Sequence, residues 1–191
     1  MDHHCVWIGQ CVGYHNHKYF VLFMAYVVLA CFCFIVFSIP PLLELTTKKI
    51  SLHAASPYRS VLSSTLIFFC VILCFSMMLS LLGMLLWHLY LIGTNQTSVE
   101  FQTNRYSAYK ASKRGWTWIN PYDLGFQRNL KQIFGPPPGK TLWYSFLPHS
   151  RMALGNGIEW PLSPLIQEGA AVQVSTNDDS TISQLTDYGE V

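Results

Sequence analysis

The sequence predicts an all-α membrane protein built around a two-helix transmembrane hairpin. Two apolar segments, residues 19–43 and 61–92, are each longer than the roughly 20 residues that cross a bilayer. The chain is 51% hydrophobic and only 12% charged, whereas an ordinary soluble domain has about 25% charged residues. The net charge of +2 is too small to indicate a nucleic-acid partner, so we expect none.

The polar stretch at residues 1–18 carries the chemistry-bearing side chains. Asp2-His3-His4-Cys5 places a carboxylate, two imidazoles and a thiol side by side, and Cys11 follows. The other four cysteines lie inside the apolar segments, where a thiol behaves as a small hydrophobe. Cys5 and Cys11 lie instead in polar sequence, which indicates metal-binding or catalytic cysteines in a reducing compartment.

These residue types can supply a nucleophile, a base and an orienting group. A free thiol has a pKa of about 8.5, so a base is needed to generate the nucleophilic thiolate at neutral pH. An imidazole can take that proton, and a carboxylate can orient the imidazole. Cys5, His3 and Asp2 would fill these roles. His4 and Cys11 remain as candidate zinc ligands, although two ligands do not complete a tetrahedral site.

The two apolar segments are the predicted transmembrane helices. Residues 19–43 end in Pro40-Pro41, and residues 61–92 contain no Asp, Glu, Lys or Arg. A soluble core helix is rarely apolar on every face over such a length, although one span with a buried hairpin arm is an alternative. We interpret His88 as a solvated histidine near the interface rather than a functional intramembrane group.

The short polar segment at residues 44–60 is predicted to be a lumenal loop. Basic residues close to the spans are evenly divided between this loop and the flanks, and only Lys113 and Arg114 favour cytoplasmic chain ends. Asn95-Gln96-Thr97 matches the N-glycosylation pattern. We expect this site to be unused, because the family resemblance described below implies a cytoplasmic position for it.

Residues 93–166 form the predicted cytoplasmic C-terminal region. Asp123 is expected to cap a short amphipathic helix that ends at Gly135, before three prolines. Its apolar face would pack on the membrane surface or, equally, as an ordinary packing helix. That face comprises Phe126, Leu130, Ile133 and Phe134. Residues 167–191, rich in Ser, Thr and Asp, are predicted to be disordered.

Three motifs in order resemble those of one family, the DHHC-type (zinc finger DHHC) protein S-acyltransferases or palmitoyltransferases. The core signature corresponds to Asp2-His3-His4-Cys5, Cys11-Val12-Gly13, Asn16 and Phe20. Thr97-Ser98-Val99-Glu100 is similar to the family's Thr-Thr-x-Glu motif. The C-terminal Asn/aromatic/Gly motif corresponds to the stretch from Asn120 through Asn129 to Gly135. The resemblance covers roughly residues 1 to 135.

The resemblance implies a membrane enzyme that transfers palmitate, or a similar acyl chain, from acyl-coenzyme A to protein cysteines through an acyl-enzyme on Cys5. It implies that residues 1–18 end a cysteine-rich zinc-binding domain. It makes His3 the base and Asp2 its orienting group, and it makes His4 and Cys11 zinc ligands. It also implies a hydrogen bond of Thr97 near Asp2 and a backbone bond of Asn129.

The implied partners are membrane lipid, acyl-coenzyme A as co-substrate, and cysteine-containing substrate proteins at the membrane. The implied location is a multi-pass protein of the Golgi or endoplasmic reticulum membrane, with the active site facing the cytoplasm. Lys18, Arg105 and Lys110 are candidates to meet the phosphates of coenzyme A or, more simply, solvent or lipid headgroups.

The sequence also departs from the family pattern. Val6 stands where the family usually has proline, Gly9-Gln10 stands where it usually has two asparagines, and Ser98 replaces a threonine but keeps the hydroxyl. Family members carry two more transmembrane helices and further zinc-ligand cysteines before the motif, so we expect an N-terminally truncated chain. The alternatives are a catalytically inactive fragment that acts as an interaction or scaffold module, and a zinc-binding scaffold without chemistry.

Overall fold

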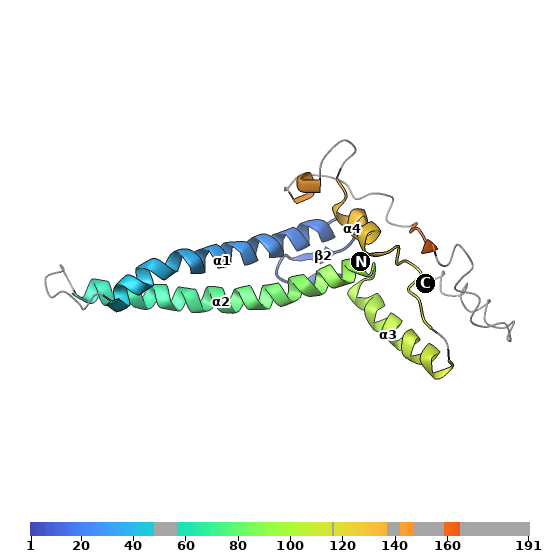
Figure 1. The fold of residues 1–191 in the computed structure, drawn as a ribbon, viewed down its shortest axis with the longest axis horizontal. Coiled ribbons are helices and arrows are strands. Elements are labelled where there is room, and N and C mark those ends of the chain that lie inside the picture. Colours follow the sequence, from blue (N-terminus) through green and yellow to red (C-terminus); the bar gives the residue numbers. More distant parts are fainter. Residues whose placement is uncertain (48–56, 116, 137–141, 147–158, 165–191) are drawn as a thin grey trace. The chain divides into compact units, whose positions relative to one another are not determined.

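The structure is a computed structural model that describes residues 1–47, 57–115, 117–136, 142–146 and 159–164 (Figure 1). The chain divides into two units, described separately below. One unit is Asn16–Tyr90, and the other combines Met1–His15 with Leu91–Val191. The predicted disordered tail, residues 167–191, lies outside the described residues.

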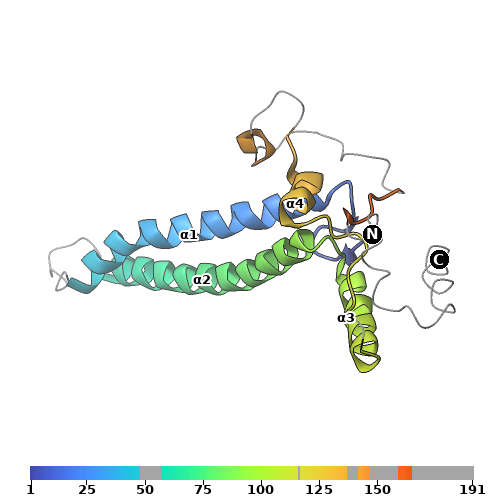
Figure 2. The same cartoon turned by 45° about the vertical axis from the view of Figure 1, so that its right-hand side comes forward.

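The first unit consists of two long helices, α1 (His17–Thr47) and α2 (Pro57–Gly93), although the last three residues of α2 belong to the second unit. The helices lie side by side in both views (Figures 1 and 2). Near the start of α1, His17 Nε2 lies 3.2 Å from Nδ1 of His88. Further along, the side chains of Cys31 and Cys74 lie close together. Cys31 follows His17 by as many residues as Cys74 precedes His88, so the two helices run antiparallel.

Both helices carry large apolar side chains on their outer surfaces. Phe37 is 78% exposed, Leu86 is 58% exposed and Phe68 is 56% exposed. Within the described residues, His17–Leu43 and Thr65–Gly93 are long and apolar enough to cross a bilayer. Because exposed apolar surface of this extent is unfavourable in water, the two helices indicate association with a membrane.

The helices extend beyond the predicted segments. Pro40 and Pro41 lie inside α1, which continues to Thr47, so these prolines do not end the helix as predicted. Pro40 and Pro41 remove the helical bonds to the carbonyls of Val36 and Phe37, a loss that membrane helices tolerate. α2 begins with Pro57, in a position that suits the fixed φ of proline. Of the predicted loop 44–60, residues 48–56 lie outside the described part.

The second unit contains a small antiparallel sheet, so the prediction of an all-α fold is incomplete. Strand β1 (His3–Cys5) pairs with β2 (Gln10–Val12). Strands of three residues are too short to show the alternation of polar and apolar residues that identifies a strand in a sequence.

Helix α3 (Ser98–Lys113) was also absent from the sequence prediction. Thr97 is its N-cap, with its Oγ1 accepting from the N–H of Glu100 at 3.2 Å. The Glu100 carboxylate in turn accepts from the N–H of Thr97 at 2.7 Å. This reciprocal pair is a capping box, which satisfies two backbone donors that a helix start leaves without partners. The spacing Thr-x-x-Glu was the available signal.

The predicted short helix is present as α4 (Phe126–Phe134), and Gly135 ends it as expected. Asp123 is not its cap. The N-cap is Gly125, and Asp123 Oδ1 instead accepts from the N–H of Gly125 at 2.9 Å. Gly125 has φ of 91°, a conformation that favours glycine. Of the predicted apolar face, Phe134 is buried, whereas Phe126 is 63% exposed. A short 3₁₀ helix, η1 (Leu142–Phe146), follows.

Two asparagine side chains tie the α4 segment to the end of α2. Asn129 is fully buried, and its Nδ2 donates to Gly93 O at 2.8 Å and to Asp123 Oδ1 at 2.7 Å. Its Oδ1 accepts from the N–H of Leu124 at 3.0 Å. Asn120 Nδ2 donates to the carbonyl of Thr94 at 2.8 Å. Carbonyls at a helix end have no partner within the helix, so these amides complete the end of α2.

Replacing Asn129 by Ala should therefore destabilise the second unit. The substitution leaves the buried carbonyl of Gly93 and the N–H of Leu124 without the Asn129 side chain, and we expect a loss of about 2–3 kcal/mol. Gln127→Ala, an exposed change two residues away in the same helix, is the control. Thermal unfolding in detergent measures both variants. Equal midpoints for the two variants would show that the Asn129 bonds contribute nothing.

Candidate active site

A tight hairpin positions the first catalytic candidates. His3 pairs with Val12, and Cys5 pairs with Gln10, which leaves residues 6–9 as the turn. The N–H of Asp2 extends the ladder by donating to Val12 O at 2.8 Å. Gly9 has φ of 63°, in the left-handed region that glycine accepts freely and asparagine accepts more readily than other residues. The departure from asparagine at this position therefore preserves the turn.

The hairpin separates the candidate residues between two faces. Successive side chains of a strand point to opposite faces, so His3 and Cys5 share one face of β1 while His4 lies on the other. His4 is directly opposite Cys11, and both of these residues are exposed. Cys5 is buried. The hairpin thus carries His3 and Cys5 on one face and the candidate metal ligands His4 and Cys11 on the other.

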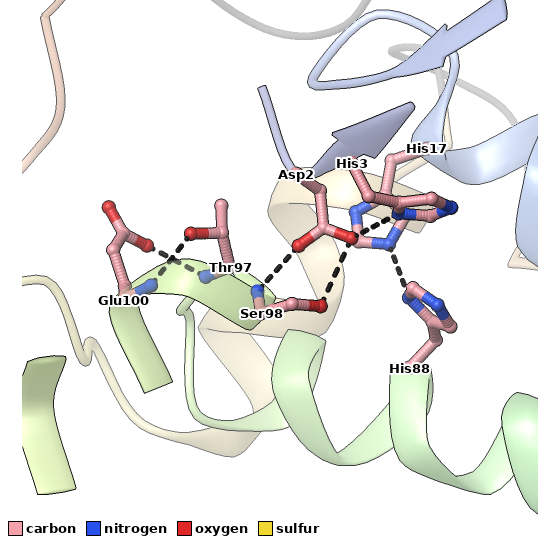
Figure 3. Close-up of polar contacts among 7 residues, drawn as sticks. All are labelled: Asp2, His3, His17, His88, Thr97, Ser98 and Glu100. Atoms are coloured by element: carbon pink, nitrogen blue, oxygen red, sulfur yellow. Dashed lines mark hydrogen bonds and ion pairs between the residues drawn. The ribbon is translucent and has the colours of Figure 1, made fainter. Parts of the chain in front are cut away.

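Asp2 is the most enclosed charged group of this site, with 2% of its side chain exposed. Its Oδ2 lies 2.7 Å from Nδ1 of His3. Ser98 donates twice to the same carboxylate, from its backbone N–H to Oδ1 at 2.5 Å and from its Oγ to Oδ2 at 3.2 Å (Figure 3). Ser98 is the first residue of α3, where the helix dipole also favours a negative charge. The carboxylate is therefore stabilised on both sides.

This contact determines which nitrogen of His3 can act as a base. An ionised carboxylate only accepts hydrogen bonds, so the proton of a neutral His3 belongs on Nδ1. Nε2 is then the basic nitrogen. The arrangement matches the orienting carboxylate and imidazole of acyl-transfer sites.

Cys5 lies on the same face of β1 as His3. Two strand positions separate the two residues, which corresponds to about 7 Å along the strand. Cys5 is buried and forms no disulfide. Catalytic hydrogen bonds are often long in the free state and shorten only around the substrate, so this spacing is compatible with the proposed nucleophile and base.

The opposite face suits a metal ion. His4 Nδ1 lies 3.4 Å from Sγ of Cys11. Zinc bonds of about 2.0 Å to nitrogen and 2.3 Å to sulfur, at a tetrahedral angle, place the two ligand atoms about 3.5 Å apart. These two side chains therefore fit as neighbouring ligands of one zinc ion.

In the Thr-Thr-x-Glu-like motif, the residue that bonds to Asp2 is Ser98 and not, as the resemblance implied, Thr97. The hydroxyl that bonds to Asp2 belongs to Ser98, whereas the side chains of Thr97 and Glu100 form the capping box. The expected backbone bond of Asn129 is present. Asn16 accepts from the N–H of Phe20 at 3.0 Å, at the start of α1.

A histidine pair in the first unit was missed. His88 is only 2% exposed, so its interpretation as a solvated residue is wrong. It contacts His17, as Figure 3 also shows, and it forms a T-shaped pair with the Phe20 ring, with ring centroids 5.0 Å apart. Lys18 is also buried, at 7%, which does not favour a role in binding soluble phosphates. A polar residue in an apolar helix was the only signal for His88.

Comparison with known proteins gives a consistent result. The family model "DHHC palmitoyltransferase" matches residues 1–105. The chain is 36% identical over 143 residues to probable protein S-acyltransferase 12 of Arabidopsis thaliana, covering 75% of this chain and 43% of that protein. It is 33% identical over 146 residues to probable protein S-acyltransferase 15 of the same plant, covering 76% of this chain and 54% of that protein. Palmitoyltransferase ZDHHC15A of Danio rerio is 28% identical over 163 residues, or 85% of this chain and 44% of that protein. The chain thus spans about half the length of these curated relatives.

The contacts of Ser98 predict a graded response to two substitutions. Ser98→Ala removes only the Oγ bond and should cost about 1 kcal/mol, whereas Ser98→Pro removes the backbone N–H as well and should cost about 2–3 kcal/mol. Proline is otherwise acceptable here, because it suits the first position of a helix. Thr97, with φ of −83° and ψ of 166°, already has the extended conformation that precedes proline.

Thermal unfolding of both variants in detergent checks this order. A Ser98→Pro protein as stable as Ser98→Ala would mean that the N–H bond to Asp2 does not stabilise the site.

Proposed function

This chain belongs to the DHHC palmitoyltransferase family, and on this premise we propose that it carries the catalytic residues of a protein S-acyltransferase. The donor is acyl-coenzyme A with a palmitoyl or similar chain, and the acceptors are cysteine-containing proteins at the membrane. The observation that carries the proposal is the contact of 2.7 Å between the Asp2 carboxylate and Nδ1 of His3, on the strand that also bears Cys5.

In the first half-reaction, the sulfur of Cys5 attacks the thioester carbonyl of acyl-coenzyme A. His3 Nε2 accepts the thiol proton, and Asp2 stabilises the resulting imidazolium. A bond forms between Sγ of Cys5 and the acyl carbon, and the bond from that carbon to the sulfur of coenzyme A breaks. His3 then returns the proton to the departing thiolate.

In the second half-reaction, a substrate cysteine takes the place of coenzyme A. His3 accepts the proton of the substrate thiol, and the substrate sulfur attacks the acyl carbon of the acyl-enzyme. Cys5 leaves as a thiolate and recovers the proton from His3. The enzyme returns to its starting state, and the acyl chain is now a thioester on the substrate protein.

We propose zinc as a structural cofactor of the hairpin. His4 and Cys11 would contribute two of its ligands, and the bound ion would fix the β1–β2 pairing on which His3 and Cys5 depend. The division between the two faces keeps Cys5 outside this ligand set.

Cobalt(II) substitution tests this assignment, because cobalt bound by a thiolate gives a sulfur-to-metal charge-transfer absorption. Cys11→Ser should abolish that absorption, whereas Cys5→Ser should leave it unchanged. The opposite result, a signal that depends on Cys5 rather than Cys11, would contradict the separation of nucleophile and ligand.

We further propose that α1 and α2 cross a Golgi or endoplasmic reticulum membrane as a hairpin, with the active site on the cytoplasmic side. Asn95, the asparagine of the glycosylation pattern, donates its side-chain amide to Tyr122 O at 2.6 Å, which supports an unmodified site. Glycosylation of Asn95 in cells would contradict this orientation.

Labelling with a clickable palmitate analogue tests the acyl-enzyme. Cys5→Ser should abolish hydroxylamine-sensitive labelling of membranes that contain the protein, because it removes the nucleophile that forms the thioester. Cys33→Ser, in the apolar part of α1, is the matched control and should keep the label.

The same pair of variants is then compared in a version of the protein that is extended by upstream sequence. This second comparison distinguishes an active acyltransferase from an inactive fragment. Label that depends on Cys5 only in the extended version would make the present chain an inactive fragment that acts as an interaction or scaffold module. No label that depends on Cys5 in either version would exclude the proposed acyltransferase chemistry.

A further inference from the structure

Helix α3 presents a face that none of the described residues of its own unit covers. None of its residues is buried. Val99, Tyr106 and Tyr109 are exposed to 63%, 64% and 59% respectively. Their spacing of seven and then three residues places them on one side of the helix, together with Lys110 and Lys113. We call these five residues the tyrosine–lysine face.

The charges of this face have one sign. Lys110 and Lys113 lie on it, Arg105 lies at its edge, and none of its five residues is acidic. Glu100, the acidic residue of α3, lies about 100° around the helix from Val99 and is occupied by the capping box. The ammonium of Lys113 lies 4.6 Å from the centre of the Tyr109 ring, so cation and aromatic ring form one continuous surface.

The chain itself holds this face close to the end of α2. α2 ends at Gly93 and α3 begins at Ser98. At no more than about 3.6 Å per residue, the connection places the start of α3 within about 18 Å of the end of α2. If α2 spans a membrane, as the proposed function holds, the start of α3 lies within reach of the lipid headgroups.

We propose that the tyrosine–lysine face binds the anionic phospholipid headgroups of the membrane that α2 crosses. The two lysines complement the lipid phosphates, and Tyr106 and Tyr109 have the apolar ring and polar hydroxyl that suit the membrane interface. A soluble anion would satisfy only the lysines and leave Val99 and both rings in water. The inference rests on the proposed function because it takes α2 as a membrane span.

Limited proteolysis of the purified chain in lipid nanodiscs tests this proposal. Trypsin cleaves after Lys110 and Lys113, and cleavage after Lys131 in α4 serves as an internal reference. Discs of phosphatidylcholine alone are compared with discs containing 30% phosphatidylserine. We expect cleavage in α3, relative to Lys131, to be about tenfold slower in the anionic discs at low salt, and this protection should disappear at high salt.

A double variant, Tyr106→Ser with Tyr109→Ser, keeps both trypsin sites but should lose the protection. Tyr122→Ser, which removes an exposed tyrosine outside α3, is the matched control and should keep it. Unchanged cleavage at Lys131 shows that the variants remain folded, and incorporation into the discs reports membrane insertion separately from the behaviour of α3.

Three outcomes would overturn the proposal. Equal cleavage in both kinds of disc would show that the face does not respond to anionic lipid. Slow cleavage in both would show that protein packing protects α3. Protection by soluble coenzyme A in phosphatidylcholine discs, without protection by phosphatidylserine, would assign the lysines to a soluble phosphate.

Discussion

The buried carboxylate of Asp2 is the group on which the proposed site depends. Burying a carboxylate is unfavourable unless hydrogen-bond donors replace the lost water. Here His3 and Ser98 provide these donors. Each of these bonds has a separate consequence. The bond to His3 sets the proton position on the imidazole, and the bonds to Ser98 join the residue that precedes β1 to the first turn of α3. One carboxylate thus links the proposed catalytic geometry to the fold of its unit.

The surroundings of Ser98 explain how this link stays in place. The capping box of Thr97 and Glu100 fixes the first turn of α3, so the N–H of Ser98 has a defined direction. At the other end of the connection, the side chains of Asn120 and Asn129 bond the backbone where α2 ends. The short connection between α2 and α3 is therefore held at both ends. A change in this connection would act on Asp2, and through Asp2 on His3, without touching a reacting group.

The sequence predicted the two long helices better than the connections between elements. The apolar lengths identified α1 and α2, and Gly135 with the following prolines identified the end of α4, whereas the catalytic roles of Asp2, His3 and Cys5 stay a prediction. The β1–β2 hairpin could not be predicted, because its strands are too short to show the alternation of polar and apolar residues. The His17–His88 contact could not be read either, because two helices that are apolar on all sides do not specify which faces meet. The spacing of Thr97 and Glu100 is that of a capping box, but in the sequence it was interpreted only as part of a family motif.

The most direct test of this account is the protonation state of His3, measured by nitrogen-15 NMR on protein labelled at histidine. The other six histidines are distinguished by comparison with a His3→Gln protein. The account predicts that neutral His3 carries its proton on Nδ1 in the native protein, and that Asp2→Ala shifts the population toward the Nε2 tautomer. A native His3 with its proton on Nε2, or a tautomer population that Asp2→Ala leaves unchanged, would contradict the claim that the Asp2 carboxylate prepares His3 as the base.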